Sequence, residues 1–182
     1  MPMVLKKRNI KKNKQKMTIH IRDSAYADLP YRPGVGIVLF NTKGQIFIAQ
    51  RIDNPDGYWQ FPQGGIEEGE DIREAVFREM EEEIGTRNAT ILHELDEWLY
   101  YDIPDYLIQK LWDQKYRGQK QKWIALRFDG VDNDIDLNTF EEPEFSKWKW
   151  ADLKDISELA VPFKREIYQK VIDRFIEISK QP

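Results

Sequence analysis

The sequence predicts an α/β fold in which helices pack against a sheet. Three observations indicate it: apolar runs of strand length, an amphipathic stretch over residues 72–84, and a second amphipathic stretch near the C-terminus. Strands and helices of this kind bury their apolar faces by forming layers. The 182 residues suit one domain with a hydrophobic core, because domains usually contain roughly 100 to 200 residues.

The first two strands are expected at residues 35–40 (VGIVLF) and 45–51 (QIFIAQR). The intervening NTKG contains Asn41 and Gly44, residue types that favour tight hairpin turns. We therefore expect these two strands to pair. The loop DNPDG follows them and is rich in turn residues.

Three more strands and a closing helix complete the predicted sheet and its layers. The strands are expected at residues 90–102, 121–130 and 146–153. The closing helix follows residue 166, where apolar residues recur at helical spacing. Its apolar stripe contains Ile167, Tyr168, Val171, Ile172, Phe175 and Ile176.

Composition limits the chemistry available to the chain. It contains no cysteine, which excludes disulfides, thiolate metal sites and cysteine nucleophiles and suits a reducing cytosol. Its only imidazoles are His20 and His93, so we do not expect a zinc site. Any metal would be held by oxygen, which favours magnesium, manganese or calcium. Because no apolar run is long enough for a membrane span and no secretory signal is evident, we expect a cytoplasmic protein without membrane contact.

Charge divides the chain into two parts. The first sixteen residues carry seven lysines and arginines and no acidic residue, whereas the remainder carries 21 basic against 32 acidic residues. We predict that residues 1–25 form a disordered basic arm and that residues 26–182 form the domain. Nucleic-acid contact is the alternative interpretation of the arm, and Met17 offers a second possible start.

Residues 64–85, GGIEEGEDIREAVFREMEEEIG, place nine carboxylates in one turn and one helix. Glycines 64, 65 and 69 permit turn conformations that other residues avoid. Asp71 and Glu74 fit a capping pair at a helix start, and a helix over residues 72–84 should follow.

The predicted helix has an apolar side and an acidic side. Apolar Val76, Phe77, Met80 and Ile84 lie toward one side, and the acidic side is formed by Glu79, Glu82 and Glu83. Like charges at this spacing cost roughly 0.2–0.5 kcal/mol per pair, a cost that a divalent cation would remove. Spacing alone favours the simpler interpretation of a solvated acidic face.

The full pattern is more specific than this spacing. Gly64, five residues, Glu70, seven residues and then REMEEEIG (78–85) resemble the Nudix box of nucleoside diphosphate hydrolases. Thr86 departs from the box, where an aliphatic residue is usual, and affects packing at the helix end. The resemblance implies a Nudix-type α/β/α sandwich with a mixed sheet and a catalytic loop-helix-loop.

The same resemblance assigns roles to residues of the box. It implies that Glu79, Glu82 and Glu83 bind divalent metal, with Gly64 in the metal shell. It also implies that Arg78 orients a glutamate and that Glu70 supports the site. Outside the helix, Glu144 is expected to complete the metal shell or to accept a proton from water, although Glu141 and Glu142 compete for that assignment. Two or three Mg²⁺ or Mn²⁺ ions are expected.

The flanking sequence narrows the family branch. YRPGVGIVLFN, WQFPQGGI, GQKQKW, PEF before WKW, and PFKREIY resemble bacterial RNA 5' pyrophosphohydrolases and plant-type dinucleoside polyphosphate hydrolases. The likeness covers residues 31–175. It implies either conversion of 5'-triphosphate RNA to 5'-monophosphate RNA, which we favour, or hydrolysis of diadenosine tetraphosphate to ATP and AMP. A non-catalytic nucleotide- or RNA-binding module is a remote third possibility, against which the intact acidic cluster argues.

The branch also implies which residues bind the nucleotide. Phe163 is expected to stack on a base, with Arg51 covering the other side, and Arg32 is expected to reach nucleotide or phosphate. Tyr101 is expected to line the same site, with a core tyrosine as an equal alternative. The remaining expected substrate contacts are Gln63, Gln119, Lys120, Lys122 and Lys164. The partner implied is a nucleotide or an RNA 5' end, and the sequence indicates no stable protein partner.

Overall fold

A computed structural model describes residues 25–182, and residues 1–24, which make up nearly all of the predicted basic arm, lie outside the described residues. The described chain forms a seven-stranded mixed sheet in the order β4-β6-β1-β2-β7, with β3 paired to β1 and β5 paired to β6. β1 and β6 are parallel, and the other pairs are antiparallel. The strands are β1 (Tyr31–Phe40), β2 (Ile46–Arg51), β3 (Gln63–Gly65), β4 (Ala89–Glu94), β5 (Leu99–Asp102), β6 (Gly118–Phe128) and β7 (Phe145–Ala151).

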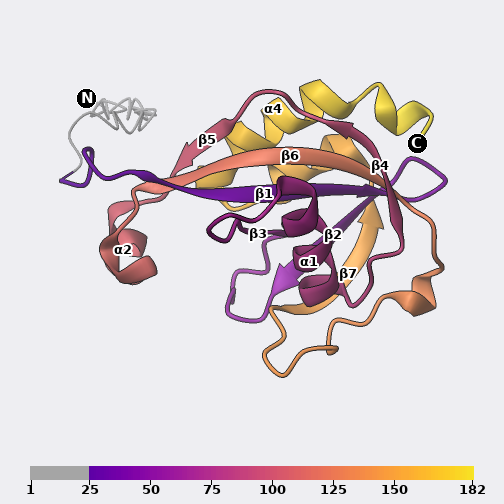
Figure 1. The fold of residues 1–182 in the computed structure, drawn as a ribbon, viewed down its shortest axis with the longest axis horizontal. Helices are drawn as coiled ribbons and strands as arrows, with labels where there is room; N and C mark the ends of the chain where they lie inside the picture. Colours follow the sequence, from indigo (N-terminus) through magenta and orange to yellow (C-terminus); the bar gives the residue numbers. More distant parts are fainter. Residues whose placement is uncertain (1–24) are drawn as a thin grey trace, which may run out of the picture.

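Helices cover both faces of this sheet, as the α/β/α prediction requires (Figure 1). On one face lies α1, and on the other lies α4. The helices are α1 (Ile72–Ile84), α2 (Asp105–Ile108), α3 (Ile156–Leu159) and α4 (Arg165–Phe175). None of the helices in residues 25–182 has the length and apolar character needed to cross a membrane.

The predicted pairing of the first two strands is confirmed only beside their turn. Gly44 has a φ of +77°, as a tight turn requires, and the ladder contains the pair Phe40 and Ile46. Beyond it the strands separate. Residues 60–65 lie between them, with Ala49 bridged to Gln60 on the β2 side and β3 paired to β1. β3 was not predicted, because it has only three residues and two of them are glycine.

The single strand expected at residues 90–102 is wrong, because a short stretch with bends at residues 96 and 97 divides it into β4 and β5. Both halves pair with β6, and Leu95 N–H still donates to Trp123 O at 3.0 Å. The other strand predictions differ from the structure by a few residues at their ends. The closing helix is confirmed and includes the predicted apolar stripe up to Phe175.

The boundaries of α1 follow from its capping residues. Asp71 Oδ1 accepts the backbone N–H of Arg73 at 2.9 Å and that of Glu74 at 3.4 Å, which caps the helix start. The Glu74 side chain pairs with Arg87 rather than completing a capping box. Gly85, with a φ of +79°, ends the helix in the left-handed conformation that favours glycine.

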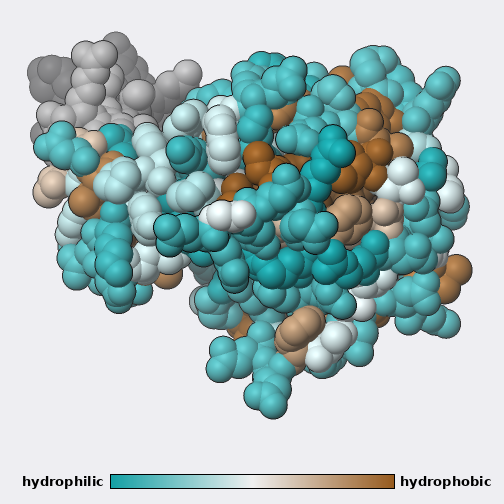
Figure 2. All heavy atoms as spheres, in the orientation of Figure 1, coloured by the Kyte–Doolittle hydropathy of each residue, from teal (hydrophilic) through white to brown (hydrophobic). Residues whose placement is uncertain are grey.

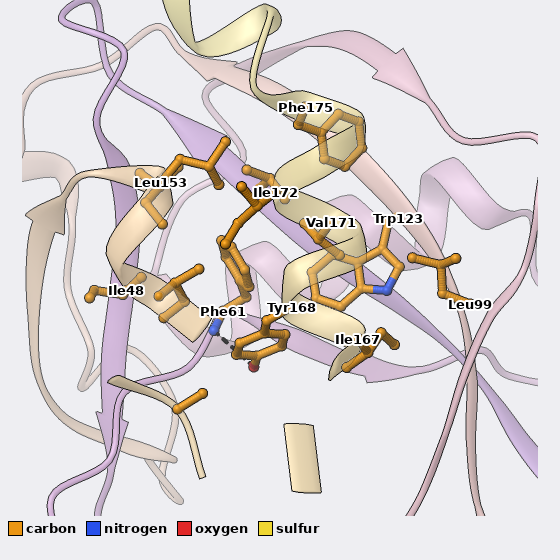
Figure 3. Close-up of a cluster of buried hydrophobic side chains, with 14 of the residues drawn as sticks. Ile48, Phe61, Leu99, Trp123, Leu153, Ile167, Tyr168, Val171, Ile172 and Phe175 are labelled. Atoms are coloured by element: carbon orange, nitrogen blue, oxygen red, sulfur yellow. Dashed lines mark hydrogen bonds between the residues drawn. The ribbon is translucent and has the colours of Figure 1, made fainter. Parts of the chain in front are cut away.

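Each face of the sheet has its own buried core. On the α4 face, Trp123, Tyr168 and Phe61 meet edge to face, with ring centroids 4.9–5.9 Å apart, and Phe61 N–H donates to the Tyr168 hydroxyl at 3.3 Å (Figure 3). On the α1 face, the helix residues Val76 and Met80 pack against the sheet. Successive residues of a strand point to opposite faces of the sheet. A strand residue that packs in the α4-side core therefore lies on the α4 face, and its two neighbours in the strand lie on the α1 face.

Candidate active site

The acidic side of α1 faces a pocket of about 470 Å³. Three of its residues come from the helix and the others from the segment before β7. They are Glu79, Glu82, Glu83, Phe140, Glu141, Glu142 and Glu144. We call this the carboxylate pocket. Hydrophilic residues cover the region of α1 on the surface (Figure 2).

Arg78 links the loop before α1 to the carboxylates on the helix. Its Nε and Nη2 donate to the two oxygens of Glu70 at 2.7 and 2.9 Å, and Nη2 also donates to Gly65 O at 2.8 Å. Its Nη1 donates to Glu79 at 2.8 Å and to Glu82 at 3.2 Å. The hydrogen bonds from Arg78 lower the pKa of Glu70. The guanidinium therefore fixes the helix carboxylates against the glycine loop.

Glu83 is the most strongly perturbed carboxylate of the pocket. It is buried, its Oε2 accepts the backbone N–H of Gln63 at 2.9 Å, and its Oε1 has no partner. Burial raises its pKa well above the ordinary value, and the neighbouring charges of Glu144 and Glu79 raise it further. Burial also raises the pKa of Glu79. The pocket thus holds desolvated carboxylates whose charge is only partly compensated.

Glu144 is held by an arginine rather than by the helix. Arg51 Nη1 lies 2.6 Å from Glu144 Oε2, and Arg51 Nε lies 2.8 Å from Asp53 Oδ1. Of the three glutamates before β7, Glu144 is the one whose charge acts on both Glu79 and Glu83. This geometry favours Glu144 over Glu141 and Glu142 as the fourth member of the acidic cluster.

The chemistry of the pocket fits a divalent cation. Its donors are carboxylate oxygens, the ligands that Mg²⁺ and Mn²⁺ prefer, and the buried Glu83 Oε1 is an acceptor without a donor. In residues 25–182, no three acidic or imidazole side chains converge as a ready-made ligand set. The contacts show why, since Arg78 holds Glu79 and Glu82 while Arg51 holds Glu144. Each of these three carboxylates is engaged by its arginine through only one oxygen, which leaves the other oxygen for a cation.

A second set of side chains adjoins the carboxylate pocket through Gln63. Its backbone contacts Glu83, and its Nε2 lies 3.5 Å from the Tyr101 hydroxyl. The Tyr101 and Phe163 rings stack with centroids 6.2 Å apart at 26°. Tyr101 is buried, and burial raises its pKa to about 12. Gln60, Gln63, Tyr101, Phe163 and Lys164 are called the Tyr101–Phe163 cluster below.

Lys164 is a buried cation in this cluster. Its Nζ donates to Gln60 Oε1 at 3.2 Å and lies 5.9 Å from the centroid of the Tyr101 ring. Burial lowers its pKa to about 8, and the charge of Arg51 lowers it as well, while Glu83 and Glu144 oppose the shift. Lys164 therefore titrates within the range in which an enzyme operates.

The glycines of β3 let charged groups approach the backbone closely. A Cβ added at Gly64 would overlap the Glu79 carboxylate, and one added at Gly65 would overlap the Arg32 guanidinium. Arg32 also lies over the Trp112 ring, 5.5 Å from its centroid. The Glu79 carboxylate thus lies against Gly64, and the Arg32 guanidinium lies against the next residue of β3, Gly65. Gly64, predicted in the metal shell, contacts the Glu79 carboxyl group.

The segment GQKQK divides between the two faces of the sheet. In β6, Gln119 and Gln121 share the face of Trp123, the α4 face, and Gln121 Nε2 donates to Gln119 Oε1 at 2.9 Å. Lys120 and Lys122 lie on the opposite face, with their ammonium groups 5.2 and 5.6 Å from the Trp98 ring centroid. The structure therefore brings Gln119 to the α4 face, where Tyr101 and Phe163 also pack, and places the two lysines away from it. Their contact with phosphate stays a prediction.

Comparison with known proteins identifies the family. The chain matches the NUDIX domain over residues 30–171 and belongs to that family. It is a hydrolase of a family whose members generally use divalent metal ions. Individual relatives agree with this family assignment. The RNA pyrophosphohydrolase of Rhodospirillum rubrum is 54% identical to this chain over 146 residues, which cover 80% of this chain and 87% of that protein. The RNA pyrophosphohydrolase of Wolbachia pipientis is 47% identical over 150 residues, with 82% and 92% covered.

Solved structures agree on the fold. The dihydroneopterin triphosphate pyrophosphohydrolase of E. coli superposes on this chain with a TM-score of 0.62 at 20% sequence identity. The alignment covers 80% of this chain and 99% of the E. coli chain. A C. elegans Ap4A hydrolase in a binary complex gives a TM-score of 0.57 at 21% identity, with 80% and 98% covered. At this identity the likeness concerns the fold alone.

Sequence reasoning missed some residues that adjoin the site. Gln60, which holds Lys164, and Phe140, which lines the carboxylate pocket, were not among the expected residues. Gln60 lies within WQFPQGG, one of the stretches that resemble the family, and this was the available signal for it. For Phe140 the sequence offered no signal beyond its position near Glu144.

Proposed function

We propose that this hydrolase is an RNA 5' pyrophosphohydrolase that converts 5'-triphosphate RNA to 5'-monophosphate RNA and releases pyrophosphate, or two phosphates in succession. The observation that carries the proposal is the junction at Gln63, where a pocket of carboxylates meets an aromatic and cationic cluster. A substrate that joins a polyphosphate to a base needs both surfaces side by side. The relatives named RNA pyrophosphohydrolase, 54% and 47% identical to this chain, support the same substrate.

Two or three Mg²⁺ or Mn²⁺ ions would be held by Glu79, Glu82, Glu83 and Glu144, with Gly64 beside them. When bound, such ions neutralise polyphosphate charge and lower the pKa of water. The chain's own contribution is to present these carboxylates. Arg78, which is tied to Glu70 and Gly65, keeps Glu79 and Glu82 in position.

One pocket glutamate accepts the proton of the attacking water. Glu83 is our candidate, because its Oε1 is buried at the pocket without a hydrogen-bond partner and can therefore accept a proton from a water there. Arg32, held against Gly65, offsets negative charge that develops on the phosphates. Lys120 and Lys122 lie on the face of β6 opposite the α4 face. We propose that they contact phosphates of any part of the substrate that reaches that face.

Phe163 and Arg51 bind the nucleotide in this proposal. Phe163 is only partly buried, so part of its ring is available for stacking on a base, with Arg51 on the other side of that base. Tyr101 supports Phe163 from behind. Lys164 supplies positive charge beside them. If Glu144 turned away toward the pocket, Arg51 would stay paired with Asp53 through Nε and Nη2, and its Nη1 would become available for this role.

A comparison of substrates tests the proposal. We expect the full chain to hydrolyse triphosphorylated RNA faster than diadenosine tetraphosphate. The opposite order would reassign the enzyme to the dinucleoside polyphosphate hydrolases, and cleavage of neither substrate with Mg²⁺ or Mn²⁺ would favour a binding module. We place the activity in the cytoplasm, where RNA 5' ends are produced.

The role of the basic arm can be tested with the same two substrates, RNA and diadenosine tetraphosphate. We propose that it strengthens phosphate contacts with RNA, so a chain that starts at Met17 should lose activity on RNA but not on the dinucleotide. Equal loss on both substrates would indicate a folding defect and would contradict this role.

A further inference from the structure

Two lysines on β7 form a cationic patch around one tryptophan. Lys147 and Lys149 are exposed, and their ammonium groups lie 5.8 and 4.4 Å from the centroid of the Trp59 ring. The two residues are separated by one position on a strand, so their side chains leave the same face about 6.8 Å apart. Trp59 itself packs against the α4-side core, which fixes its ring. We call Trp59, Lys147 and Lys149 the Trp59 patch.

The charge of this patch is not neutralised by carboxylates. Within residues 25–182, neither lysine takes part in an ion pair, and each contacts the Trp59 ring. A ring face holds an ammonium group in place without cancelling its charge, unlike a carboxylate. Beyond the arm the chain has 32 acidic against 21 basic residues, so the patch is a local concentration of positive charge on an otherwise acidic body.

The Trp59 patch is continuous with the Tyr101–Phe163 cluster. Trp59 precedes Gln60, whose side chain accepts from Lys164, and Trp59 N–H donates to Leu159 O at 3.0 Å. On β7, Lys147 is opposite Gln50, the neighbour of Arg51. The patch therefore lies one residue along the chain from Gln60 of the cluster, and in the sheet it lies opposite the residue before Arg51. It also lies on the same face of the sheet as Phe163.

We propose that the Trp59 patch binds backbone phosphates of the RNA strand downstream of the nucleotide at Phe163. The inference rests on the proposed function, because only a substrate with a chain beyond its first nucleotides could reach both sites. Lysines donate to phosphate oxygens as mobile point charges and do not read bases, so the patch would favour longer RNA without sequence preference. A dinucleoside polyphosphate has no such chain and would gain nothing from it.

The test is the variant Lys147→Gln/Lys149→Gln, assayed with a triphosphorylated decanucleotide and with a triphosphorylated dinucleotide. We expect the KM for the decanucleotide to rise about five- to tenfold at low salt, and the slope of log affinity against log salt to fall by about 1.4, because each contact to a single strand contributes about 0.7. The KM for the dinucleotide should not change. Lys147→Arg/Lys149→Arg should keep the wild-type preference for the longer RNA.

The matched control is Lys43→Gln/Lys154→Gln, which removes the same charge from two other exposed lysines that also take part in no ion pair within residues 25–182. It should leave both substrates unaffected. An equal rise in KM for the two substrates, or a control variant as impaired as the test variant, would overturn the patch as a specific site. So would self-association of the variant with unchanged RNA kinetics, because lysines on an edge strand also prevent sheet-to-sheet pairing.

Binding of the 5'-monophosphate decanucleotide separates this inference from the proposed function. If the wild-type protein cleaves no triphosphorylated RNA, the proposed function fails, but the binding comparison between wild type and Lys147→Gln/Lys149→Gln still decides the patch. Weaker and less salt-dependent binding by the variant supports it, and equal binding overturns it.

Discussion

In the carboxylate pocket, half of the six acidic residues come from one helix, whereas the Tyr101–Phe163 cluster draws its side chains from β3, β5 and the segments that precede β3 and α4. Residues three and four apart on a helix meet in any fold that contains the helix. Residues of the second set meet only after the sheet has formed. The reactive chemistry is therefore encoded locally, and recognition of the nucleotide depends on tertiary structure.

The two regions also differ in how burial acts on charge. Burial raises the pKa of Glu83 and lowers that of Lys164 to about 8, so in each case it favours the neutral form. Arg51 stands between them, since it pairs with Glu144 and its charge lowers the pKa of Lys164. The variants below separate the contributions of the two regions.

The largest effect is expected from Glu83→Gln. Loss of a general base that also belongs to the acidic cluster should reduce kcat by about a thousandfold or more. Hydrolysis of triphosphorylated RNA measures the loss, and circular dichroism checks that folding is intact. Near-normal activity would remove Glu83 from the mechanism.

The same variant should be more stable than the wild type when metal is absent. Because burial raises the folded pKa of Glu83, its contribution to stability is fully present below the unfolded pKa and is lost as pH rises through the folded pKa, so at pH 7 keeping this carboxyl group buried costs stability. Glutamine removes this penalty and can still accept the Gln63 N–H. Thermal unfolding with a chelator measures it, with about 2–4 °C expected per kcal/mol. A lower Tm would contradict the assignment of a buried, uncompensated charge.

Arg78→Lys tests whether the carboxylate pocket depends on a fork of hydrogen bonds. A lysine cannot reproduce the contacts to Glu70, Glu79 and Gly65 O together, so we expect a loss of about 1–3 kcal/mol in the free energy of unfolding. Arg73→Lys on the same helix is the control, because Arg73 is exposed and makes one long ion pair with Glu94. Urea denaturation compares them, and equal stability of the two variants would contradict the expectation.

Phe163→Ala addresses the recognition side. Loss of a stacking contact of about 1–3 kcal/mol should raise KM by roughly 5- to 150-fold with little change in kcat. Steady-state kinetics on RNA and on diadenosine tetraphosphate measure this, and Tyr106→Ala, at an exposed ring outside the cluster, is the control. A fall in kcat with unchanged KM would assign Phe163 to the chemical step instead.

The smallest effect concerns Lys164 and pH. Its ammonium loses its charge as pH rises through about 8, so the KM of the wild type for RNA should increase above that pH. Lys164→Met should have a higher KM that no longer changes between pH 7 and pH 9, measured at a constant metal concentration. Because its folded pKa is lowered, Lys164 contributes stability only above its unfolded pKa and loses it as pH falls through about 8. The methionine variant should therefore also be the more stable at pH 7.

Much of the fold could be predicted because its signals are local. The α1 boundaries agree with the structure, since Asp71 caps the first turn and the apolar and acidic sides follow the helical period. Strand positions were recognised from apolar runs. The division of residues 90–102 into two strands was not, because both halves pair with β6 and only a short stretch with bends at residues 96 and 97 separates them. β3 was too short to leave a pattern.

The sequence by itself determined that an acidic helix follows a glycine loop, and with it the class of chemistry, because helix neighbours are set by spacing along the chain. Only the tertiary structure decided that Arg51 pairs with Glu144, that Lys120 and Lys122 lie on the other face from Gln119, and that Trp59 holds two lysines of β7. Arg51 and Glu144 are 93 residues apart in the chain, and Trp59 and β7 are almost as distant. Contacts over such separations depend on which strands pair and which face each residue takes, and these follow from the packing of the whole sheet.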